Sequence, residues 1–402
     1  MFIRDNMKFQ ISKLYIALFI RSFLLLSPVI LLFYQENGLN YKHFFLFQGV
    51  FYITSITAEL PIGYISDNYS KKYMLTASLG IFFVVVALLY FYSGLHAILT
   101  AVILMAISKV MVDNATSGYI YDYLTYNNAN EKMTKYYGYT NFYLAFGTAA
   151  AAIIGSLLYI YYGSKFILKI EIILSIIAVL ILASLPNIYT ERKNNFKNRI
   201  AKFILSAKEI CTNNSIKYHI LYSGFLTSFS ILFALSFQPL MQGALFPIVM
   251  FGAITFINHG IRALSGIISG KLQNKLDIHK LIVPLYLLYI SAFIFMITIL
   301  NNTNIILNTA LLIMICLIIG VQLLFSILHV CRLHKYVTVE NRGTLMSLNN
   351  GFSRSIAAII LISSKFLMDK FDMQDFYIAS IIMFLLLCTH IMIKTYKVTD
   401  QC

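Results

Sequence analysis

The chain reads Gly63-Tyr64-Ile65-Ser66-Asp67-Asn68-Tyr69-Ser70-Lys71-Lys72 between two long apolar runs, at about 43–66 and 74–93. A helix that crosses a hydrocarbon core of about 30 Å needs about 20 apolar residues. Both flanking runs reach that length. The polar, basic segment is therefore predicted to be a short loop between two membrane-spanning helices.

Interruptions of the same kind divide the whole chain of 402 residues. They leave twelve apolar runs, near 12–34, 43–66, 74–93, 97–121, 138–160, 166–186, 217–237, 248–270, 280–300, 304–328, 345–367 and 376–394. Apolar residues make up 59% of the chain and charged residues only 12%, against about 25% charged in a soluble protein. The sequence predicts an all-α membrane protein with twelve transmembrane helices, and this composition excludes a soluble enzyme.

The basic residues predict how these helices are oriented. With both termini in the cytoplasm, 22 of the 31 Lys and Arg residues fall on the cytoplasmic side, five lie at or near the outer face and four lie within spans. Cytoplasmic loops of membrane proteins carry such an excess. We expect a multi-pass protein of the cytoplasmic (inner) membrane with both termini cytoplasmic. The net charge of +15 then reflects topology, so nucleic-acid binding is not needed to explain it.

The longest cytoplasmic segment lies at mid-chain, with six predicted spans on each side. We therefore predict six-helix bundles at 1–188 and 217–402, joined by a linker at 189–216. Apolar residues recur in the linker at helical spacing, with basic residues between them: Phe196, Ile200, Phe203, Ile204 and Ala207. This pattern predicts an amphipathic helix on the inner leaflet; a plain solvated linker is the alternative.

A second copy of the loop pattern follows the eighth run, at Gly270-Lys271-Leu272-Gln273-Asn274-Lys275-Leu276-Asp277. Gly63 and Gly270 are separated by 207 residues, and so are Asp67 and Asn274. Because the two loops hold the same place in the two predicted bundles, we interpret the halves as products of an internal duplication.

Two motifs resemble the major facilitator superfamily of secondary transporters. One is Glu59-Leu60-Pro61-Ile62-Gly63 running into Asp67 and Lys71-Lys72, and the other is Thr116-Ser117-Gly118-Tyr119-Ile120-Tyr121-Asp122-Tyr123-Leu124. The second motif resembles the branch that exports drugs and metabolites. The resemblance implies two six-helix bundles that rock around a central cavity, a small-molecule substrate and a monomer.

The resemblance also implies a cytoplasmic latch formed by Asp67, Lys71 and Asp122, together with Glu59 and Gly63. The chain departs from the family pattern at Ser70, where Gly is usual, and at Lys71, where Arg is usual. Lys cannot form a two-pronged contact with a carboxylate, which predicts a weaker latch. Ordinary turn capping is the alternative. The fifth span lacks the Pro that antiporters of the family often carry, so antiport rests on the branch resemblance alone.

Ionisable residues inside the predicted spans give the best functional signal. There are six, all of which must face water or one another because charges in lipid are unfavourable: Arg21, Lys109, Asp113, Glu171, Arg262 and Arg354. Lys109 and Asp113 are four residues apart, so they share one helix face. We predict Asp113 as the first candidate for proton coupling, with Lys109 as its partner, and Glu171 as the second. A static ion pair that fixes helix packing is the alternative.

The same six residues predict the charge of the substrate, since four are cations and two are carboxylates. A cationic surplus favours a solute that carries a carboxylate or phosphate, with Arg21, Arg262 and Arg354 as clamps. His259 precedes Arg262 by three residues and can titrate near neutral pH, or it serves as a plain hydrogen-bond former. Polar groups of the substrate are predicted to contact Asn258, Asn349 and Asn350, unless these residues join helices.

These patterns predict a proton-coupled exporter of a small organic anion or zwitterion, such as a metabolite, siderophore or drug. The alternative is a proton-coupled importer of a small nutrient such as an amino acid or organic acid. The sequence has no hydrolase or metalloprotease motif, and its five cysteines show no metal or redox spacing. We therefore expect no enzyme activity, no cofactor and no metal. The expected partners are a small solute, protons and the lipid bilayer.

Overall fold

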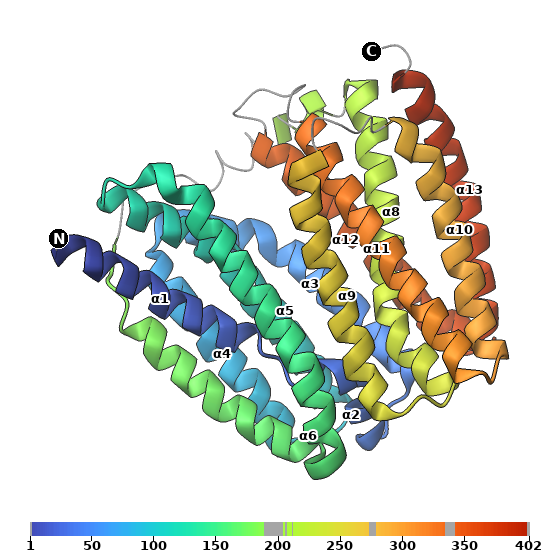
Figure 1. Cartoon of the computed structure of the whole chain (residues 1–402), viewed down its shortest axis with the longest axis horizontal. Coiled ribbons are helices and arrows are strands. Elements are labelled where there is room, and N and C mark those ends of the chain that lie inside the picture. Colours follow the sequence, from blue (N-terminus) through green and yellow to red (C-terminus); the bar gives the residue numbers. More distant parts are fainter. Residues whose placement is uncertain are drawn as a thin grey trace. The chain divides into compact units, whose positions relative to one another are not determined.

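A computed structural model describes residues 2–188, 204–205, 207–210, 212–272, 279–333 and 342–399. Every regular element in these residues is helical (Figure 1), which confirms the predicted all-α class. Among the residues that the structure describes, eleven helical stretches are long and apolar enough to cross a membrane, so the chain is a multi-pass membrane protein. The predicted amphipathic helix of the linker lies largely outside the described residues, since Phe196, Ile200 and Phe203 are not among them.

The chain forms two compact units. Unit 1 comprises Met1–Asn40, Val50–Phe196 and Ile248–Phe256, and unit 2 comprises Tyr41–Gly49, Lys197–Pro247 and Ile257–Cys402. Unit 1 contains α1 (Phe2–Ser22), the short η1 (Ser27–Val29), α2 (Ile30–Glu36), most of α3 (Tyr41–Asn68), α4 (Lys71–Phe91), α5 (Leu95–Tyr126), the short η2 (Asn130–Lys132) and α6 (Met133–Ala183). Unit 2 contains α8 (Asn214–Gly243), most of α9 (Ile248–Leu272), α10 (His279–Asn301), α11 (Ile305–Leu333), α12 (Arg342–Met368) and α13 (Met373–Thr399).

The first predicted span is broken in the middle, where the sequence predicted one continuous run over 12–34. Helix α1 ends at Ser22, and helical structure resumes with η1 at Ser27. Pro28 lies in η1 and has no backbone N–H, so it cannot continue the hydrogen-bond ladder of α1. In place of that ladder, the backbone N–H of Leu26 donates to the carboxylate of Glu171 at 3.1 Å.

Helix α6 has 51 residues, which would give a straight rod of about 75 Å, more than twice the hydrocarbon thickness. Gly163 interrupts it with φ 75° and ψ 177°, a conformation essentially restricted to glycine. Figure 1 shows α6 reversing direction near its middle. The break falls between the predicted spans at 138–160 and 166–186.

Small residues let α1 and the first part of α6 approach closely. A Cβ atom at Gly147 would overlap the Ser22 hydroxyl and lie 2.8 Å from the Phe19 carbonyl oxygen, and one at Gly155 would overlap the Leu25 carbonyl oxygen. Small residues at these positions of the predicted fifth span thus let α6 lie directly against α1 and the segment after it.

Unit 2 is built around α8, which packs against α10, α11, α12 and α13. Its centre is aromatic: the rings of Phe229, Phe233, Phe293 and Phe384 lie with centroids 4.9–5.9 Å apart in successive contacts. The hydroxyl of Tyr289 joins this cluster to the backbone by donating to the Leu226 carbonyl at 2.8 Å. Buried aromatic groups with their polar tips satisfied give a rigid centre.

Equivalent glycine contacts occur once in each unit, in agreement with an internal duplication. In unit 2, a Cβ atom at Gly49 would lie 3.2 Å from the Ala358 carbonyl oxygen and 2.5 Å from the Ile362 side chain. In unit 1, one at Gly252 would overlap the Ala152 carbonyl oxygen and the Ser156 hydroxyl. Ala152 and Ala358 are 206 residues apart, and so are Ser156 and Ile362.

The glycine contact of α6 yields a prediction about stability. Gly155→Ala should lower the free energy of unfolding by about 1–3 kcal/mol, because the added methyl group must displace the backbone at Leu25. Gly138→Ala is the matched control: it lies in the same helix with nothing within 4 Å of a Cβ atom, and alanine favours a helix by about 1 kcal/mol over glycine. Thermal unfolding of the detergent-solubilised protein measures both. Equal midpoints for the two variants would contradict the packing described.

Candidate functional site

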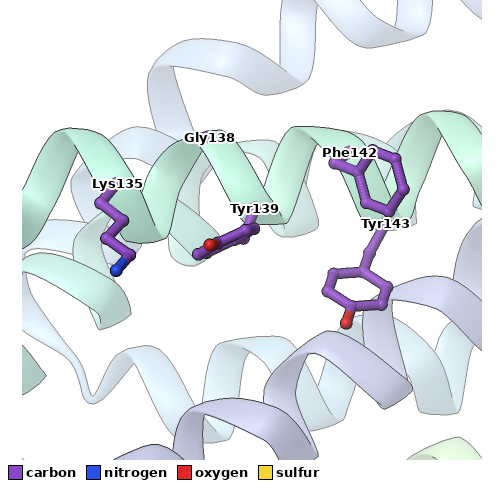
Figure 2. A pocket seen from close by; sticks show the side chains of 5 residues that line it. All are labelled: Lys135, Gly138, Tyr139, Phe142 and Tyr143. Carbon is purple, nitrogen blue, oxygen red and sulfur yellow. The ribbon is translucent and has the colours of Figure 1, made fainter.

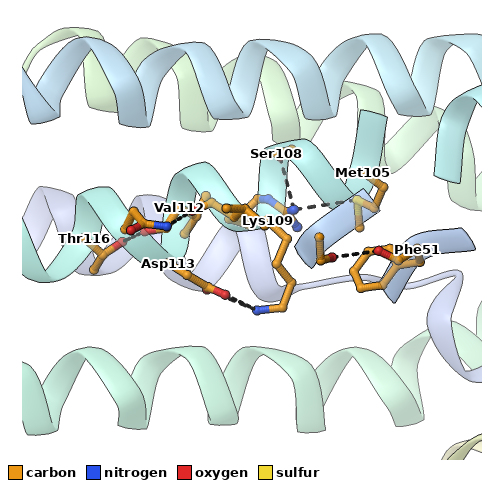
Figure 3. A network of polar contacts seen from close by, with 11 residues as sticks. Phe51, Met105, Ser108, Lys109, Val112, Asp113 and Thr116 are labelled. Carbon is orange, nitrogen blue, oxygen red and sulfur yellow. Dashed lines mark hydrogen bonds and ion pairs between the residues drawn. The ribbon is translucent and has the colours of Figure 1, made fainter. Parts of the chain in front are cut away.

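An ion pair lies near the middle of α5. The Nζ atom of Lys109 donates to both carboxylate oxygens of Asp113, at 2.8 and 3.1 Å. About half of each side chain is exposed, 53% for Lys109 and 47% for Asp113. Figure 3 shows the two side chains meeting on one side of the helix. Because a charged pair this far from the helix ends is unfavourable in lipid, the exposed face of α5 is best explained as a surface that water reaches.

Arg21 lies behind this face, in the interior of unit 1. Its guanidinium group donates to the Ser108 hydroxyl at 3.3 Å and lies 4.3 Å from the centre of the Phe82 ring. Ser108 in turn donates to the carbonyl oxygen of Ser78 at 2.8 Å. Only 6% of Arg21 is exposed. This predicted substrate clamp therefore joins α1, α4 and α5 in the described structure.

Glu171 is also buried, with 4% of its surface exposed. Its carboxylate accepts the hydrogen bond from the Leu26 backbone N–H, and it is close enough to Arg21 to interact electrostatically. A carboxylate is a strong acceptor for a backbone N–H. Glu171 thus stabilises the irregular segment that breaks the first span.

In unit 2, predicted substrate residues lie on α9 and α12. Arg262 is exposed, Arg354 and His259 are half-buried, and Asn350 is exposed. Asn258 and Asn349 are 6% and 5% exposed, and the Oδ1 atom of each has no hydrogen-bond partner among the described residues. Buried polar atoms without a partner are uncommon. Asn349 therefore has a stronger structural case for contact with a solute than Asn350.

The predicted latch residues are partly described. The aliphatic part of Lys71, at the start of α4, packs against Gly118 of α5, with its Cε atom 2.8 Å from where a Cβ atom of Gly118 would lie. Asp122, one turn further along α5, is buried with 7% exposed. Gly63 is buried and Glu59 half-buried on α3. The side chain of Asp67 and the second loop at 273–278 lie outside the described part of the structure.

A hollow of about 460 Å³ lies along the first part of α6, lined by Lys135, Gly138, Tyr139, Phe142 and Tyr143. Figure 2 shows the side chains of Lys135, Tyr139 and Tyr143 extending from the same side of the helix. The ring of Tyr143 stacks on Tyr15 of α1 with centroids 5.0 Å apart. All lining residues come from one helix, so this hollow lacks the convergent polar groups of a solute site.

Two further polar contacts join residues that the sequence analysis did not pair. His219 on α8 and His329 on α11 are hydrogen-bonded although 110 residues separate them. Glu36 accepts hydrogen bonds from Tyr159 and Ser164, which follow it by 123 and 128 residues. Only the presence of ionisable side chains in or beside apolar runs could have indicated these residues. No group of three potential metal ligands occurs in the part of the chain that the structure describes.

Comparison with known proteins places these features in a family. Residues 14–362 match the Major Facilitator Superfamily. A crystal structure of a variant of the nucleoside transporter NupG is similar with a TM-score of 0.80 and 16% sequence identity, covering 97% of this chain and 100% of that one. A bacterial homologue of the human lysosomal transporter Spinster, inward-facing and unoccupied, has a TM-score of 0.67 and 12% identity, covering 98% and 97% of the two chains. No curated protein matches the sequence.

The interpretation of the α5 face predicts water access along it. In a variant without native cysteines, Ser117→Cys, one helical turn beyond Asp113, should react with a water-soluble, charged thiol reagent in open membrane fragments, because the reactive thiolate forms only where water is present. Val84→Cys on α4 is the control, since Val84 is 48% exposed but apolar and we expect it to face lipid. Equal reaction rates at the two positions would contradict a wet face on α5.

Proposed function

We propose that this chain, which belongs to the Major Facilitator Superfamily, is a proton-coupled exporter of a small organic anion or zwitterion. Membership of this family, together with the similarity to solved transporter structures, supports a secondary transporter rather than an enzyme.

We further propose that α6 provides two spans, which gives twelve in all, with both termini in the cytoplasm. The protein is proposed to act as a monomer in the cytoplasmic (inner) membrane, since alternating access needs only the two bundles of one chain.

The observation that carries this proposal is the Lys109–Asp113 pair. Its two charges are half-exposed near the middle of a helix long enough to cross the membrane. A carboxylate at such a site can release its proton while it is paired with Lys109 and take one up when the pair separates. Alternating exposure of the site to the two sides of the membrane would then couple proton movement to solute movement.

The charge of the substrate is proposed from the accessible residues. Lys109, Arg262 and Arg354 are exposed or half-buried, whereas Asp113 is the carboxylate on the α5 face. Three cations with one carboxylate favour an anionic or zwitterionic solute. We propose Arg262 and Arg354 as its clamps, with Asn258, Asn349, Asn350 and His259 contacting its polar groups.

The buried charges of unit 1 are proposed to act differently. Arg21 is bonded to Ser108, and Glu171 is bonded to the backbone of Leu26. We propose that they hold the broken first span in place, so that they influence the solute and proton sites through the position of α1. Glu171 would then support coupling, with Asp113 as the residue that exchanges the proton.

The substrate class can be tested by measuring how the full-length protein, reconstituted in liposomes, exchanges labelled compounds across the membrane. The probes are labelled organic acids, amino acids, a lipophilic cation and, because NupG is named a nucleoside transporter, a nucleoside. We expect exchange of a probe that carries a carboxylate or phosphate. Exchange of the lipophilic cation or the nucleoside alone would overturn the proposal.

Replacement of the proposed proton site yields a second prediction. Asp113→Asn should reduce uptake driven by a pH gradient by at least about tenfold, because the variant loses the group that links proton binding to solute binding. Exchange of solute without a gradient should continue. Asp375→Asn, an exposed carboxylate at the start of α13, is the matched control. An Asp113 variant that the gradient still drives normally would remove Asp113 from this role.

We propose that Asp67, Lys71 and Asp122 form a latch with Glu59 and Gly63, as the resemblance to the family implies. The part of this latch that the structure describes is the packing of Lys71 against Gly118 beside the buried Asp122. Lys71 combines an aliphatic stem in a packed position with a charged tip, so replacement by Met retains the packing and removes the charge.

The latch can be tested with two neighbouring lysines. Lys71→Met should abolish most of the flux while leaving the amount of protein in the membrane normal, and Asp67→Asn should do the same. Lys72→Met is the control, since Lys72 carries the same charge one position along α4. Undiminished flux in the Lys71 and Asp67 variants would show that these residues only cap a turn.

A further inference from the structure

An exposed stripe runs along the first part of α6, between Met133 and the break at Gly163. Its members follow one another at intervals of three, four or seven residues, which places them on one face of the helix: Lys135, Tyr139, Phe142, Phe146, Ile153 and Leu157. All six side chains are exposed. None of them belongs to the proton-coupling, substrate or latch sites proposed above.

The stripe has the composition of a surface in contact with lipid. Beyond Lys135, its side chains are aromatic or aliphatic. The helix rises about 27 Å from Tyr139 to Leu157, which is close to the hydrocarbon thickness of about 30 Å. An apolar face of this length is unfavourable in water. We therefore expect it to face the hydrocarbon, unlike the charged face of α5.

The stripe is hollowed at the end that carries Lys135. The hollow has a volume of about 460 Å³ and is lined by Lys135, Gly138, Tyr139, Phe142 and Tyr143. Nothing lies within 4 Å of where a Cβ atom of Gly138 would be, so the space beside this glycine stays open. Figure 2 shows Lys135 at one end of the hollow and the rings of Phe142 and Tyr143 at the other.

Aromatic contacts hold the walls of the hollow in place. The rings of Phe142 and Phe146 stack with centroids 5.9 Å apart, and Phe146 contacts Phe19 of α1 at the same distance. Tyr15 of α1 packs edge-on against Tyr139 at 6.2 Å. Walls that are already ordered reduce the entropy lost when a flexible ligand binds.

Basic side chains lie at the Lys135 end of the stripe. Lys135 is exposed in the first turn of α6, and Lys132 precedes it in η2, with its Nζ atom 3.8 Å from the Glu131 carboxylate. Lys13 lies on α1, two residues before Tyr15. A lysine at the end of an apolar helix face extends its ammonium group to the membrane surface. Phosphate groups of lipids lie at this level and carry the opposite charge.

From this arrangement we infer that the hollow binds one phospholipid with a negatively charged headgroup. A phosphate oxygen of the lipid accepts a hydrogen bond from the Nζ atom of Lys135, and an acyl chain lies on the rings of Phe142 and Phe146. The site offers one charged group at its end and apolar contacts along its length, which is the order in which a phospholipid presents its own groups. This lipid site goes beyond the proposed transport function and does not depend on it.

The test uses the absence of tryptophan from the sequence, because one introduced tryptophan is then a unique fluorescent reporter. The full-length Phe142→Trp protein is placed in bilayers of phosphatidylglycerol, which is anionic, and phosphatidylcholine, which is zwitterionic. Either lipid in turn carries brominated acyl chains, which quench tryptophan on contact. We expect phosphatidylglycerol to bind about fivefold more strongly at this reporter, the preference that one basic residue gives at an anionic membrane surface.

Matched variants separate the hollow from the general charge of the surface. Ile294→Trp, at an exposed apolar position of α10, should report equal binding of the two lipids. In the Phe142→Trp protein, Lys135→Gln should remove the preference, whereas Lys132→Gln, which removes the same charge three residues earlier, should retain it. Gly138→Leu should also remove the preference, because its side chain fills the hollow while leucine favours a helix more than glycine does.

Equal binding of the two lipids at the Phe142→Trp reporter, or a preference that survives Lys135→Gln, would overturn the proposed lipid site. Three further results would overturn it by identifying another occupant. Quenching by aqueous iodide in place of the brominated lipids would indicate water. Loss of the preference on addition of inorganic phosphate would indicate a site for free phosphate. Shielding from both lipids that ends when the protein is diluted in the bilayer would indicate a second copy of the chain.

The unmodified protein provides a measurement that needs no reporter, so the site can be tested even where a variant fails to fold. In native mass spectrometry of the delipidated protein in detergent, phosphatidylglycerol should bind at a lower concentration than phosphatidylcholine, and equal binding would overturn the site. These experiments use no transported solute. A failure of the proposed transport function would therefore leave their outcome unaffected.

Discussion

A charged side chain inside a membrane-spanning helix needs water, an opposite charge or both. Lys109 and Asp113 satisfy this constraint by pairing on one face of α5 with about half of each side chain exposed. Within unit 1, α4 packs along α5, and Arg21 of α1 reaches α5 through Ser108. One face of α5 therefore exposes this charge pair, while another face is held in the interior of the unit.

The interior of unit 1 combines close packing with an irregular first span. Gly147 and Gly155 bring α6 against α1 and the segment after it, at distances that a larger side chain would prevent. The same segment lacks a helical hydrogen-bond ladder, and the Glu171 carboxylate supplies an acceptor for it. In a membrane, where backbone groups cannot rely on water, such a side-chain acceptor makes a broken helix possible.

Sequence reasoning predicted the features that depend on local spacing. The apolar runs predicted most of the membrane-spanning helices. The four-residue spacing of Lys109 and Asp113 predicted their ion pair, because residues four apart share a helix face. It did not predict the break after Ser22, the burial of Arg21 or the bond between His219 and His329. Each of these depends on partners far away in the chain, such as Glu171, 145 residues from Leu26. An apolar run also predicts a span without showing where Pro28 or Gly163 interrupts it.

We propose that these charges serve the movement of an organic anion or zwitterion across the membrane. The most direct test compares the small molecules inside and outside cells that carry or lack the gene. We predict that loss of the gene causes one solute with a carboxylate or phosphate group to accumulate inside the cells and to decrease outside. Accumulation of an organic cation, or unchanged levels of all organic anions and zwitterions on both sides of the membrane, would contradict this role.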